Sequence, residues 1–435
     1  MTTISDPNLP LIESARVLID QGQLTEAADV LNEARAQAPN DPRVYLMAGV
    51  MSEKAGNVAG AFQLMRTGLE LAPNWAPGIV VLAQLQARQG QFAEAKENAE
   101  TALQLDSETR VVLDGAIDVA HLTGDIEQAV RLLQQGLVQQ PTDSKWRFML
   151  ANNLSQLERF DEALALWDGL LAESPEDEKT LLGRMHTLLA AGRLKEAEHV
   201  TSALLALAPD NAVYAYYDAR ARGQTPPHQP AELNRSLFDS AAHIFDQQLV
   251  QSLRYQLPEV IAKKIIALYP DRKLSLLDLG CGTGLLGAQL GKLKGRMVGV
   301  DVSPKMLEQA RRHDVYDSLD VADLHDALAR AAASPYKVIT ALDVCVYVGD
   351  LSQAIPAAWR ALVPNGLVIL SCESGPEDGP DLFLNPTTER YVHKRSHVEG
   401  LCRTAGFSVE AQNTVLRYQK GKPVNGFVIT ARKVA

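Results

Sequence analysis

Alanine recurs at one fixed spacing through the first half of the sequence, and this period limits what the chain can fold into. The alanines stand 34 residues apart, at Ala27, Ala61, Ala95, Ala129, Ala163 and Ala197. Glycines keep the same spacing, with Glu158 in the one place that lacks one, at Gly22, Gly56, Gly90, Gly124 and Gly192. Prolines keep it too, with Ser107 in the one gap, at Pro39, Pro73, Pro141, Pro175 and Pro209. Six units in register predict stacked copies of one supersecondary structure.

Each repeated residue suits one position in a pair of helices. A glycine ends the first helix, because a left-handed conformation costs glycine little. An alanine allows two helices to cross closely, and the proline is expected to begin the next helix, where its missing N–H costs nothing. The segments between them, such as GQLTEAADVLNEARAQAP, have helical apolar periodicity. A 34-residue helix–turn–helix unit resembles the tetratricopeptide repeat, and the resemblance covers residues 8 to about 210.

This resemblance implies an α-helical solenoid of six repeats over residues 1–222. Residues 211–222 are expected to form a capping helix, because the open end of a solenoid exposes apolar surface. Similar arrays bind a peptide or a protein partner in a concave groove. The sequence leaves open whether this array binds a partner or the acceptor, pairs with a second subunit, or packs on a catalytic domain.

The pattern changes after a proline-rich linker at residues 223–234, GQTPPHQPAELN. Residues 235–435 alternate apolar strands with helices, which predicts a doubly wound, Rossmann-like α/β domain. Strands are expected at 273–280, 295–302, 317–321, 337–342 and 366–372, followed by an antiparallel hairpin at 407–419 and 422–432. The sequence therefore predicts a seven-stranded sheet.

A glycine-rich turn follows the first of these strands, with Asp278, Gly280, Gly282 and Gly284. Side chains must be absent where a ligand approaches the backbone closely, so this turn predicts a nucleotide-type cofactor site. Asp301 ends the second strand, where it can accept both ribose hydroxyls. The same stretch also contains GxGxxG, the dinucleotide motif, so a nicotinamide-dependent oxidoreductase stays open at this point.

Four further segments distinguish the two cofactors. DVSPKML, VADL, TALDVCVYVGDL and RALVPNGLVILSCE, in this order, resemble class I S-adenosylmethionine-dependent methyltransferases over residues 235–432. The whole chain resembles bacterial methyltransferases that carry N-terminal tetratricopeptide repeats. The resemblance implies S-adenosyl-L-methionine as cofactor, with the methionine part at the glycines, its amino group near Asp278 and the ribose on Asp301. The cofactor residues carried over by position are Asp278, Gly280, Gly282, Gly284, Asp301, Met306, Asp323, Leu324 and Asp343.

The helix before the first strand often covers the cofactor in this family. Phe238 and Phe245 stand seven residues apart in an amphipathic segment. Together with Tyr255 they are expected to line such a lid, and plain core packing is the alternative.

The methyl acceptor is expected at loops after the fourth and fifth strands. Asp343-Val-Cys-Val-Tyr347 lacks the NPPY or DPPY motif, which argues against adenine or glutamine amide acceptors and favours oxygen. In the polar loop 373–397, His393 is the candidate general base, with Tyr347 and Arg390 positioning the acceptor. A carboxylate acceptor would need no base. Arg417, within a strand, is expected to face the acceptor or to pair with an acidic neighbour.

The remaining expectations come from composition. A net charge of −11 argues against nucleic acid as a partner. Four scattered cysteines suggest neither a metal site nor disulfides, and without a signal peptide or an apolar run of ~20 residues a cytoplasmic protein is expected, not a membrane one. Two functions remain: an enzyme that methylates a small-molecule, peptide or protein acceptor, and an interaction scaffold whose cofactor domain senses without catalysis.

Overall fold

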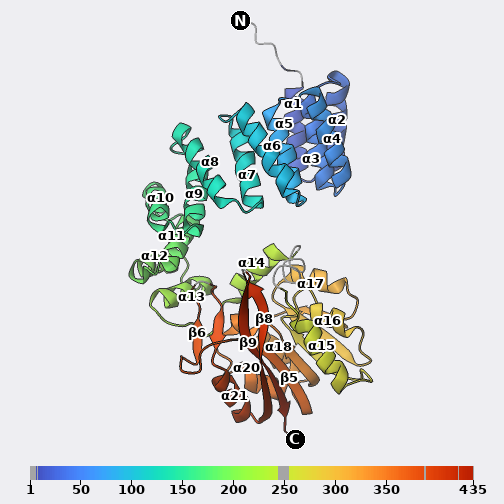
Figure 1. The fold of residues 1–435 in the computed structure, drawn as a ribbon, viewed down its shortest axis with the longest axis vertical. Helices are drawn as coiled ribbons and strands as arrows, with labels where there is room; N and C mark the ends of the chain where they lie inside the picture. Colours follow the sequence, from blue (N-terminus) through green and yellow to red (C-terminus); the bar gives the residue numbers. More distant parts are fainter. Residues whose placement is uncertain (1–5, 7, 243–253, 387, 420, 435) are drawn as a thin grey trace. The chain divides into compact units, whose positions relative to one another are not determined.

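The computed structural model describes residues 6, 8–242, 254–386, 388–419 and 421–434 (Figure 1). The chain divides into two compact units, Met1–Ala191 and Gly192–Ala435. The domain boundary that composition predicts at 223–234 stays a prediction. None of the helices in the described ranges combines the length and the apolar character that crossing a membrane requires.

The repeats form helices of nearly constant length. Those of the first unit are α1 (Leu9–Asp20), α2 (Leu24–Gln37), α3 (Pro42–Lys54), α4 (Val58–Leu71), α5 (Ala76–Arg88), α6 (Phe92–Leu105), α7 (Arg110–Leu122), α8 (Ile126–Gln139), α9 (Ser144–Gln156), α10 (Phe160–Glu173) and α11 (Glu178–Ala190). Helices α1 with α2, α3 with α4, α5 with α6, α7 with α8 and α9 with α10 pack as consecutive pairs. The pattern continues in the second unit with α12 (Leu194–Leu207) and the expected capping helix, α13 (Ala212–Ala221).

The repeated alanines and glycines have the roles that the sequence predicts. All six alanines are completely buried between helices. The glycines follow the first helix of each pair in the left-handed conformation, with φ between 71° and 82°. Glu158, which replaces glycine in one repeat, takes the same conformation with φ 60°. The turn geometry is therefore set by the repeat and not by glycine alone.

The expected role of the repeated prolines is wrong. Pro39 does not begin a helix: it lies two residues beyond the end of α2, and α3 begins at Pro42. The other prolines of the period have the same place after the second helix of their pair. A proline there stops the preceding helix, because its ring excludes a further helical turn.

The second unit continues with an α/β sheet and its helices (Figure 1). The helices are α14 (Ala231–Ala241), α15 (Leu257–Leu268), α16 (Leu285–Leu290), α17 (Pro304–Arg311), α18 (Leu324–Ala331), α19 (Cys345–Val348), α20 (Ala354–Arg360) and α21 (Arg395–Thr404). The strands are β1 (Ser275–Leu279), β2 (Arg296–Asp301), β3 (Ser318–Val321), β4 (Tyr336–Ala341), β5 (Leu362–Ser374), β6 (Leu382–Leu384), β7 (Tyr391–His393), β8 (Phe407–Gln419) and β9 (Lys422–Lys433).

The sheet has the doubly wound order that the sequence predicts. Strands β3, β2, β1, β4 and β5 are parallel neighbours, and β9 pairs antiparallel with β5 and with β8. The chain moves outward from β1 to β3 and then crosses back to β4. The carboxyl ends of β1 and β4 therefore form the switch point, where ligands of such folds bind.

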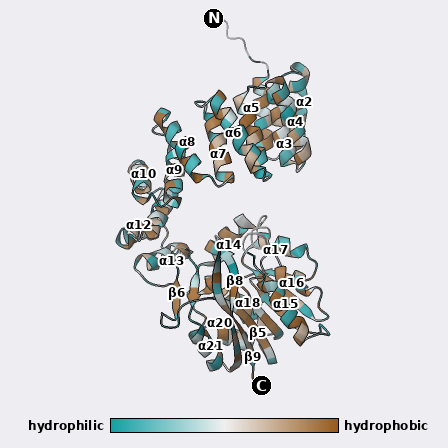
Figure 2. Cartoon of the chain, in the orientation of Figure 1, coloured by the Kyte–Doolittle hydropathy of each residue, from teal (hydrophilic) through white to brown (hydrophobic). Residues whose placement is uncertain are grey.

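The central strands β1, β2 and β4 carry buried apolar residues on both faces and lie between two helical layers (Figure 2). Leu276 and Val338 pack with α15 and α16, whereas Leu277 and Ile339 pack with α18, α20 and α21. Neighbouring residues of one strand thus belong to different cores, as the two-residue period of a strand requires.

The segment 373–397 is not only a polar loop. In the described residues it holds β6 and β7, which give the sheet nine strands where the sequence predicts seven. Glu373 pairs with Gly426 of β9 on one edge of β5 and with Val392 of β7 on the other. Strand β4 pairs with this same edge of β5 earlier along β5. Strand β7 therefore pairs with the edge at the point where β4 has already ended.

Candidate functional site

One cavity of about 510 Å³ opens at the switch point of the sheet. It brings together most of the site residues that the sequence predicts. Those that line it are Asp278, Gly280, Gly282, Asp301, Met306, Asp323, Leu324, Asp343, Phe238, Tyr347 and Arg390. Gly284 and His393 do not line it, and Phe245 lies outside the described residues.

The turn after β1 requires glycine at its tightest points. Gly280, Gly282 and Gly284 all have positive φ, at 63°, 55° and 85°. A Cβ atom on Gly280 would stand 2.3 Å from Cγ2 of Val344. Gly284 caps the start of α16 and so supports the turn from outside the cavity. The backbone of the turn is thus open to a ligand.

Asp301 joins the glycine turn to the end of β2. One carboxylate oxygen accepts the N–H of Gly282 at 2.9 Å, and the other accepts the N–H of Ser303 at 2.9 Å. Burial raises the pKa of this carboxyl. A carboxylate offers about four acceptor positions, so two remain for other donors. A pair of vicinal hydroxyls on a ligand fits them.

Asp278 is a second buried carboxylate, and it differs from Asp301 in its neighbours. It accepts the hydroxyls of Thr340 at 2.7 Å and Tyr316 at 2.8 Å. Burial raises its pKa to about 6. Among the described residues no lysine, arginine or histidine forms an ion pair with Asp278. A cationic group of a ligand would supply the missing charge.

The lining near β3 also fits a nucleotide base. Asp323 caps α18 by accepting the N–H of Asp326 at 2.8 Å, which leaves its other oxygen and the start of the helix beside the cavity. Met306 is buried at the start of α17. His228 and His325 also line this cavity, with ring centroids 6.3 Å apart.

Helix α14 borders the cavity, as the predicted lid would. Arg235 donates to the carbonyl of Val302 at 3.1 Å, and Asp239 accepts the hydroxyl of Ser303 at 2.5 Å. Phe238, on the same helix, lines the cavity. Asn234 also lines it, and its Oδ1 is buried without a hydrogen-bond partner among the described residues. The sequence analysis missed Asn234, because a lone asparagine in a helix has no motif around it.

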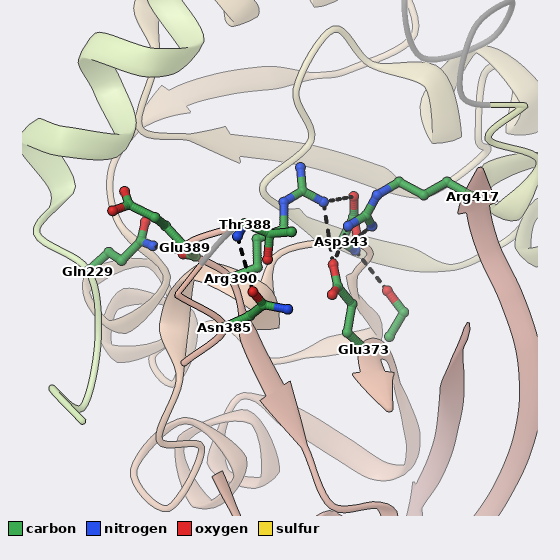
Figure 3. Close-up of polar contacts among 9 residues, drawn as sticks. Gln229, Asp343, Glu373, Asn385, Thr388, Glu389, Arg390 and Arg417 are labelled. Carbon is green, nitrogen blue, oxygen red and sulfur yellow. Dashed lines mark hydrogen bonds and ion pairs between the residues drawn. The ribbon is translucent and has the colours of Figure 1, made fainter. Parts of the chain in front are cut away.

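Four charged side chains meet at the carboxyl ends of β4 and β5 (Figure 3). Arg417 is almost completely buried; it donates to Asp343 at 2.6 Å and to Glu373. Nη1 of Arg390 lies 3.5 Å from Glu373 and 3.9 Å from Asp343. Pairing of Arg417 with acidic neighbours, one of the two predicted options, is confirmed.

The two acids of this cluster keep raised pKa values despite the arginines. Burial raises the pKa of Asp343, and burial with the neighbouring Asp343 charge raises the pKa of Glu373 to about 7. Asp343 also has a left-handed backbone, with φ 58°. Such strained conformations in non-glycine residues are frequent at functional sites.

Tyr347 forms the apolar side of the same region. Its ring meets the edge of Phe238 at a centroid distance of 5.3 Å, and the guanidinium of Arg390 lies 5.5 Å from its centroid. Burial raises the pKa of the Tyr347 hydroxyl to about 12, so this group stays protonated near neutrality. The structure thus brings Tyr347 and Arg390 together at the cavity, as the sequence predicts.

His393 stands apart from these residues. It is buried on β7, where Nε2 lies 2.6 Å from the carbonyl oxygen of Gly349. Burial lowers its pKa to about 4. Its other ring nitrogen is buried without a partner among the described residues. A ring held away from the cavity cannot reach an acceptor, so the geometry argues against His393 as the general base.

Comparisons with known proteins agree with both halves of this architecture. Residues 277–368 match the model of a methyltransferase domain. Residues 12–74, 76–109, 120–177 and 154–222 match tetratricopeptide-repeat models. The chain therefore combines tetratricopeptide repeats with a methyltransferase domain, as predicted.

The curated relatives match a quarter to a third of this chain. Ubiquinone biosynthesis O-methyltransferase of Bartonella tribocorum is 27% identical over 132 residues, which are 30% of this chain and 53% of that protein. The protein of the same name from Azorhizobium caulinodans is 33% identical over 24% of this chain and 42% of its own length. The chain thus spans about half the length of the curated relatives it matches.

Two solved structures are each similar to somewhat less than half of the chain. Magnesium protoporphyrin IX methyltransferase of Synechocystis, solved with bound S-adenosylmethionine, is 18% identical over 48% of this chain and 100% of its own, with a TM-score of 0.38. A tetratricopeptide protein with an unusual peptide-binding site is 17% identical over 44% of this chain and 97% of its own, with a TM-score of 0.37.

Proposed function

We propose that this chain is an S-adenosylmethionine-dependent methyltransferase. One observation carries the proposal: two buried carboxylates, Asp278 and Asp301, flank a glycine turn at the cavity. One of them lacks a cationic partner among the described residues, and the other keeps two free acceptor positions. S-adenosylmethionine carries an ammonium group, which would pair with Asp278, and a ribose diol, which would donate to Asp301.

The residues at the cavity fit this cofactor in a definite order. Asp301 would hold the ribose, Asp278 the amino group, and the turn at Gly280 the methionine part. Met306 and the start of α18, with Asp323 and Leu324, would hold the adenine. When bound, the cofactor supplies a methyl group on a sulfonium, ready for in-line displacement.

We propose oxygen as the methyl acceptor. The absence of an NPPY or DPPY motif after β4 supports this, and so do relatives that are named O-methyltransferases. Tyr347 and Arg390 would position the acceptor, since both line the cavity beyond β4 and β5. If the acceptor hydroxyl must lose a proton, the acids of the charged cluster are better placed than His393. The acceptor itself is a small molecule, a peptide or a protein.

The tetratricopeptide array would bind a protein partner, the acceptor or a second subunit. The first unit carries 27 aspartates and glutamates against 14 lysines and arginines, so most of the chain's negative charge resides there. A basic segment on the partner would complement it. Four free, buried cysteines agree with a reducing compartment, and we propose the cytoplasm.

Calorimetry tests the cofactor class. The full chain should bind S-adenosylmethionine and S-adenosylhomocysteine and give no heat with NAD. Incubation with tritiated S-adenosylmethionine and fractionated lysate should then label a small-molecule or a protein fraction. Binding of NAD without a response to either sulfur ligand would contradict the proposal. Cofactor binding with no labelled fraction would favour the alternative of a sensing scaffold.

A further inference from the structure

The segment between α13 and α14 is hydrogen-bonded to the backbone at Tyr347 and Asp350, after β4, and to the hydroxyl of Tyr391 on β7. Gln229 donates its backbone N–H to the carbonyl of Tyr347 at 3.0 Å. Pro227 accepts the N–H of Asp350 at 2.7 Å, and Pro226 accepts the hydroxyl of Tyr391 at 2.7 Å. This segment is therefore part of the cavity's support and not a free linker.

An ion pair links α13, the last helix of the repeat pattern, to the predicted acceptor region. Arg220, near the end of α13, donates to Glu389 at 2.6 Å, and its side chain is only 9% exposed. The guanidinium lies over the rings of Tyr216 and Tyr217, at 5.6 Å and 5.4 Å from their centroids. Stacking on both rings restricts the guanidinium to this orientation.

The backbone conformation of Glu389 connects its ion pair with Arg220 to the adjacent residue, Arg390. Glu389 has a left-handed conformation, with φ 54°. Its carbonyl accepts the side-chain amide of Gln229 at 2.5 Å, and its N–H donates to Asn385 at 2.8 Å. A non-glycine residue keeps such a conformation only where its surroundings hold it.

Glu389 and Arg390 point in different directions (Figure 3). The side chain of Glu389 lies on the side of Gln229, whereas that of Arg390 reaches the charged cluster with Glu373 and Asp343. Because the two residues are adjacent, fixing the backbone of the first fixes the start of the second side chain. The guanidinium of Arg390 contacts Glu373, Asp343 and the ring of Tyr347, and the backbone at 389–390 sets the point from which its side chain reaches them.

We propose that Arg220 and Glu389 are positioning residues for methyl transfer. The pair holds the 389–390 backbone so that Arg390 and Tyr347 present the acceptor to the cavity. The end of the repeat pattern is then part of the acceptor site, and a partner that displaces α13 lowers transfer without displacing the cofactor. The effect on methyl transfer rests on the proposed function. The effect of the pair on the 389–390 backbone does not depend on that function.

The test uses the full chain with Arg220→Ala and Glu389→Gln. Arg222→Ala is the matched control, because Arg222 lies at the same helix end and its ion-pair partners among the described residues are the nearby Asp218 and Glu198. Measurements are amide hydrogen exchange of peptides covering 344–350 and 385–391, S-adenosylhomocysteine affinity, the thermal midpoint, and tritiated methyl transfer into the lysate fraction that the parent chain labels.

Both test variants should exchange these amides about tenfold faster and transfer methyl groups about tenfold more slowly at saturating cofactor. Their cofactor affinity should stay within about twofold, since the pair is outside the cofactor residues. Arg220→Ala should also lower the thermal midpoint, because it removes a nearly buried side chain and its ion pair, whereas Glu389→Gln keeps a hydrogen-bond acceptor and should change the midpoint less. The control should match the parent chain throughout.

Unchanged exchange in both variants would overturn the inference, and so would faster exchange with unchanged transfer. An equal loss in the control would overturn it as well. If the parent chain neither binds S-adenosylhomocysteine nor labels any fraction, the proposed function fails. The exchange data would then still decide whether the pair fixes this backbone.

Discussion

At the scale of single residues, Asp278 and Asp301 show how burial prepares a site for a charged ligand. Both carboxylates are buried at the ends of neighbouring strands. Asp301 is held by two backbone N–H groups, whereas Asp278 has only two hydroxyl donors. Asp278 therefore stores an unfavourable charge that a cationic ligand would relieve.

We predict that Asp278→Asn stabilises the free protein while weakening cofactor binding. With a pKa near 6 in the folded chain, Asp278 is charged at pH 7.5, and the cost of burying that charge is fully present above pH 6. The variant should gain on the order of 2 kcal/mol in free energy of unfolding at pH 7.5. The gain should fade as pH drops through 6 towards 4.

Calorimetry across pH supplies the second readout for this variant. The parent chain should lose affinity for S-adenosylhomocysteine as pH falls below 6, because protonated Asp278 no longer attracts an ammonium group. The variant should bind weakly at every pH. Asp317→Asn is a suitable control, since Asp317 accepts from the backbone of Met297 and does not line the cavity. A variant that binds like the parent chain would refute the assignment of Asp278.

We also predict that Asp301→Ala weakens cofactor binding by ~1.5–3 kcal/mol, the scale of losing charge-assisted hydrogen bonds. The sheet should survive, because the strand pairing of β1 and β2 uses backbone groups only. Calorimetry with S-adenosylhomocysteine measures the loss, and circular dichroism checks the fold. Unchanged affinity would mean that the ribose lies elsewhere.

At the scale of elements, the turns of the repeats show that the fold can impose a backbone conformation that the residue itself disfavours. Glu158 takes the left-handed conformation that glycine takes in five other repeats. Glutamate adopts it at a cost, because its Cβ crowds the backbone there. The stacked helices α9 and α10 on either side must hold it in place.

We predict that Glu158→Gly stabilises the chain by about 0.5–1 kcal/mol, because relief of the strained conformation exceeds the added freedom of the unfolded chain. Gly124→Ala, at the same position of the preceding repeat, should be destabilising by a similar amount. Urea unfolding of both variants measures the two changes. A Glu158→Gly chain less stable than its parent would show that the side chain contributes contacts of its own.

The elements differ in how far the sequence could predict them. Strands β1, β2 and β4 are continuous apolar runs, and their positions are confirmed within a few residues. Strands β6 and β7 have no such pattern: they are three residues each, and β7 forms because the end of β5 offers an unpaired edge beyond β4. Pairing between distant segments leaves little local signal.

The same limit explains which candidate site residues the sequence could bring together. The glycine turn and Asp301 belong to one strand–turn–helix–strand unit, so local spacing places them together. The sequence predicts a base at His393 from its place after the fifth strand, but the burial of this ring depends on the pairing of β7 with β5 and on its contact with Gly349. The cluster of Asp343, Glu373, Arg390 and Arg417 comes from four separate segments, which no single motif records.

We predict that His393→Gln keeps methyl transfer within about threefold of the parent chain. A general base would cost ~10²–10⁴ in turnover. The glutamine amide can still donate to the carbonyl of Gly349, so the fold should persist. His393→Ala should lose about 1–3 kcal/mol of stability instead, because it leaves that buried carbonyl unpaired. Tritiated-methyl transfer and thermal unfolding separate the two effects. A large loss of turnover with normal stability would restore His393 as the base.

At the scale of the whole molecule, the two halves differ in charge. The first unit holds about twice as many acidic as basic residues, whereas the second holds 28 lysines and arginines against 26 aspartates and glutamates. The methyltransferase unit thus has a net charge close to zero. The negative electrostatic potential of the chain therefore comes mainly from the repeats. Steering of a basic partner would be a property of the repeats, and it should weaken with salt.

The last prediction concerns where the chain can be divided. Composition places the catalytic domain at residues 235–435, but hydrogen bonds from Arg220, Pro226, Pro227 and Gln229 reach the cavity wall at 347–350 and 389–391. A fragment of residues 192–435 keeps these contacts, and a fragment of residues 235–435 loses all of them.

We expect the fragment 192–435 to bind S-adenosylhomocysteine like the full chain and to unfold in one cooperative transition. The fragment 235–435 should lack Asn234 and His228 from the cavity as well, so it should bind at least tenfold more weakly and expose apolar surface near Tyr391 and Tyr347. Calorimetry and thermal unfolding of both fragments make the comparison. If residues 235–435 bind and unfold as well as the longer fragment, the boundary at the proline-rich segment is correct and helix α13 is dispensable for the cofactor site.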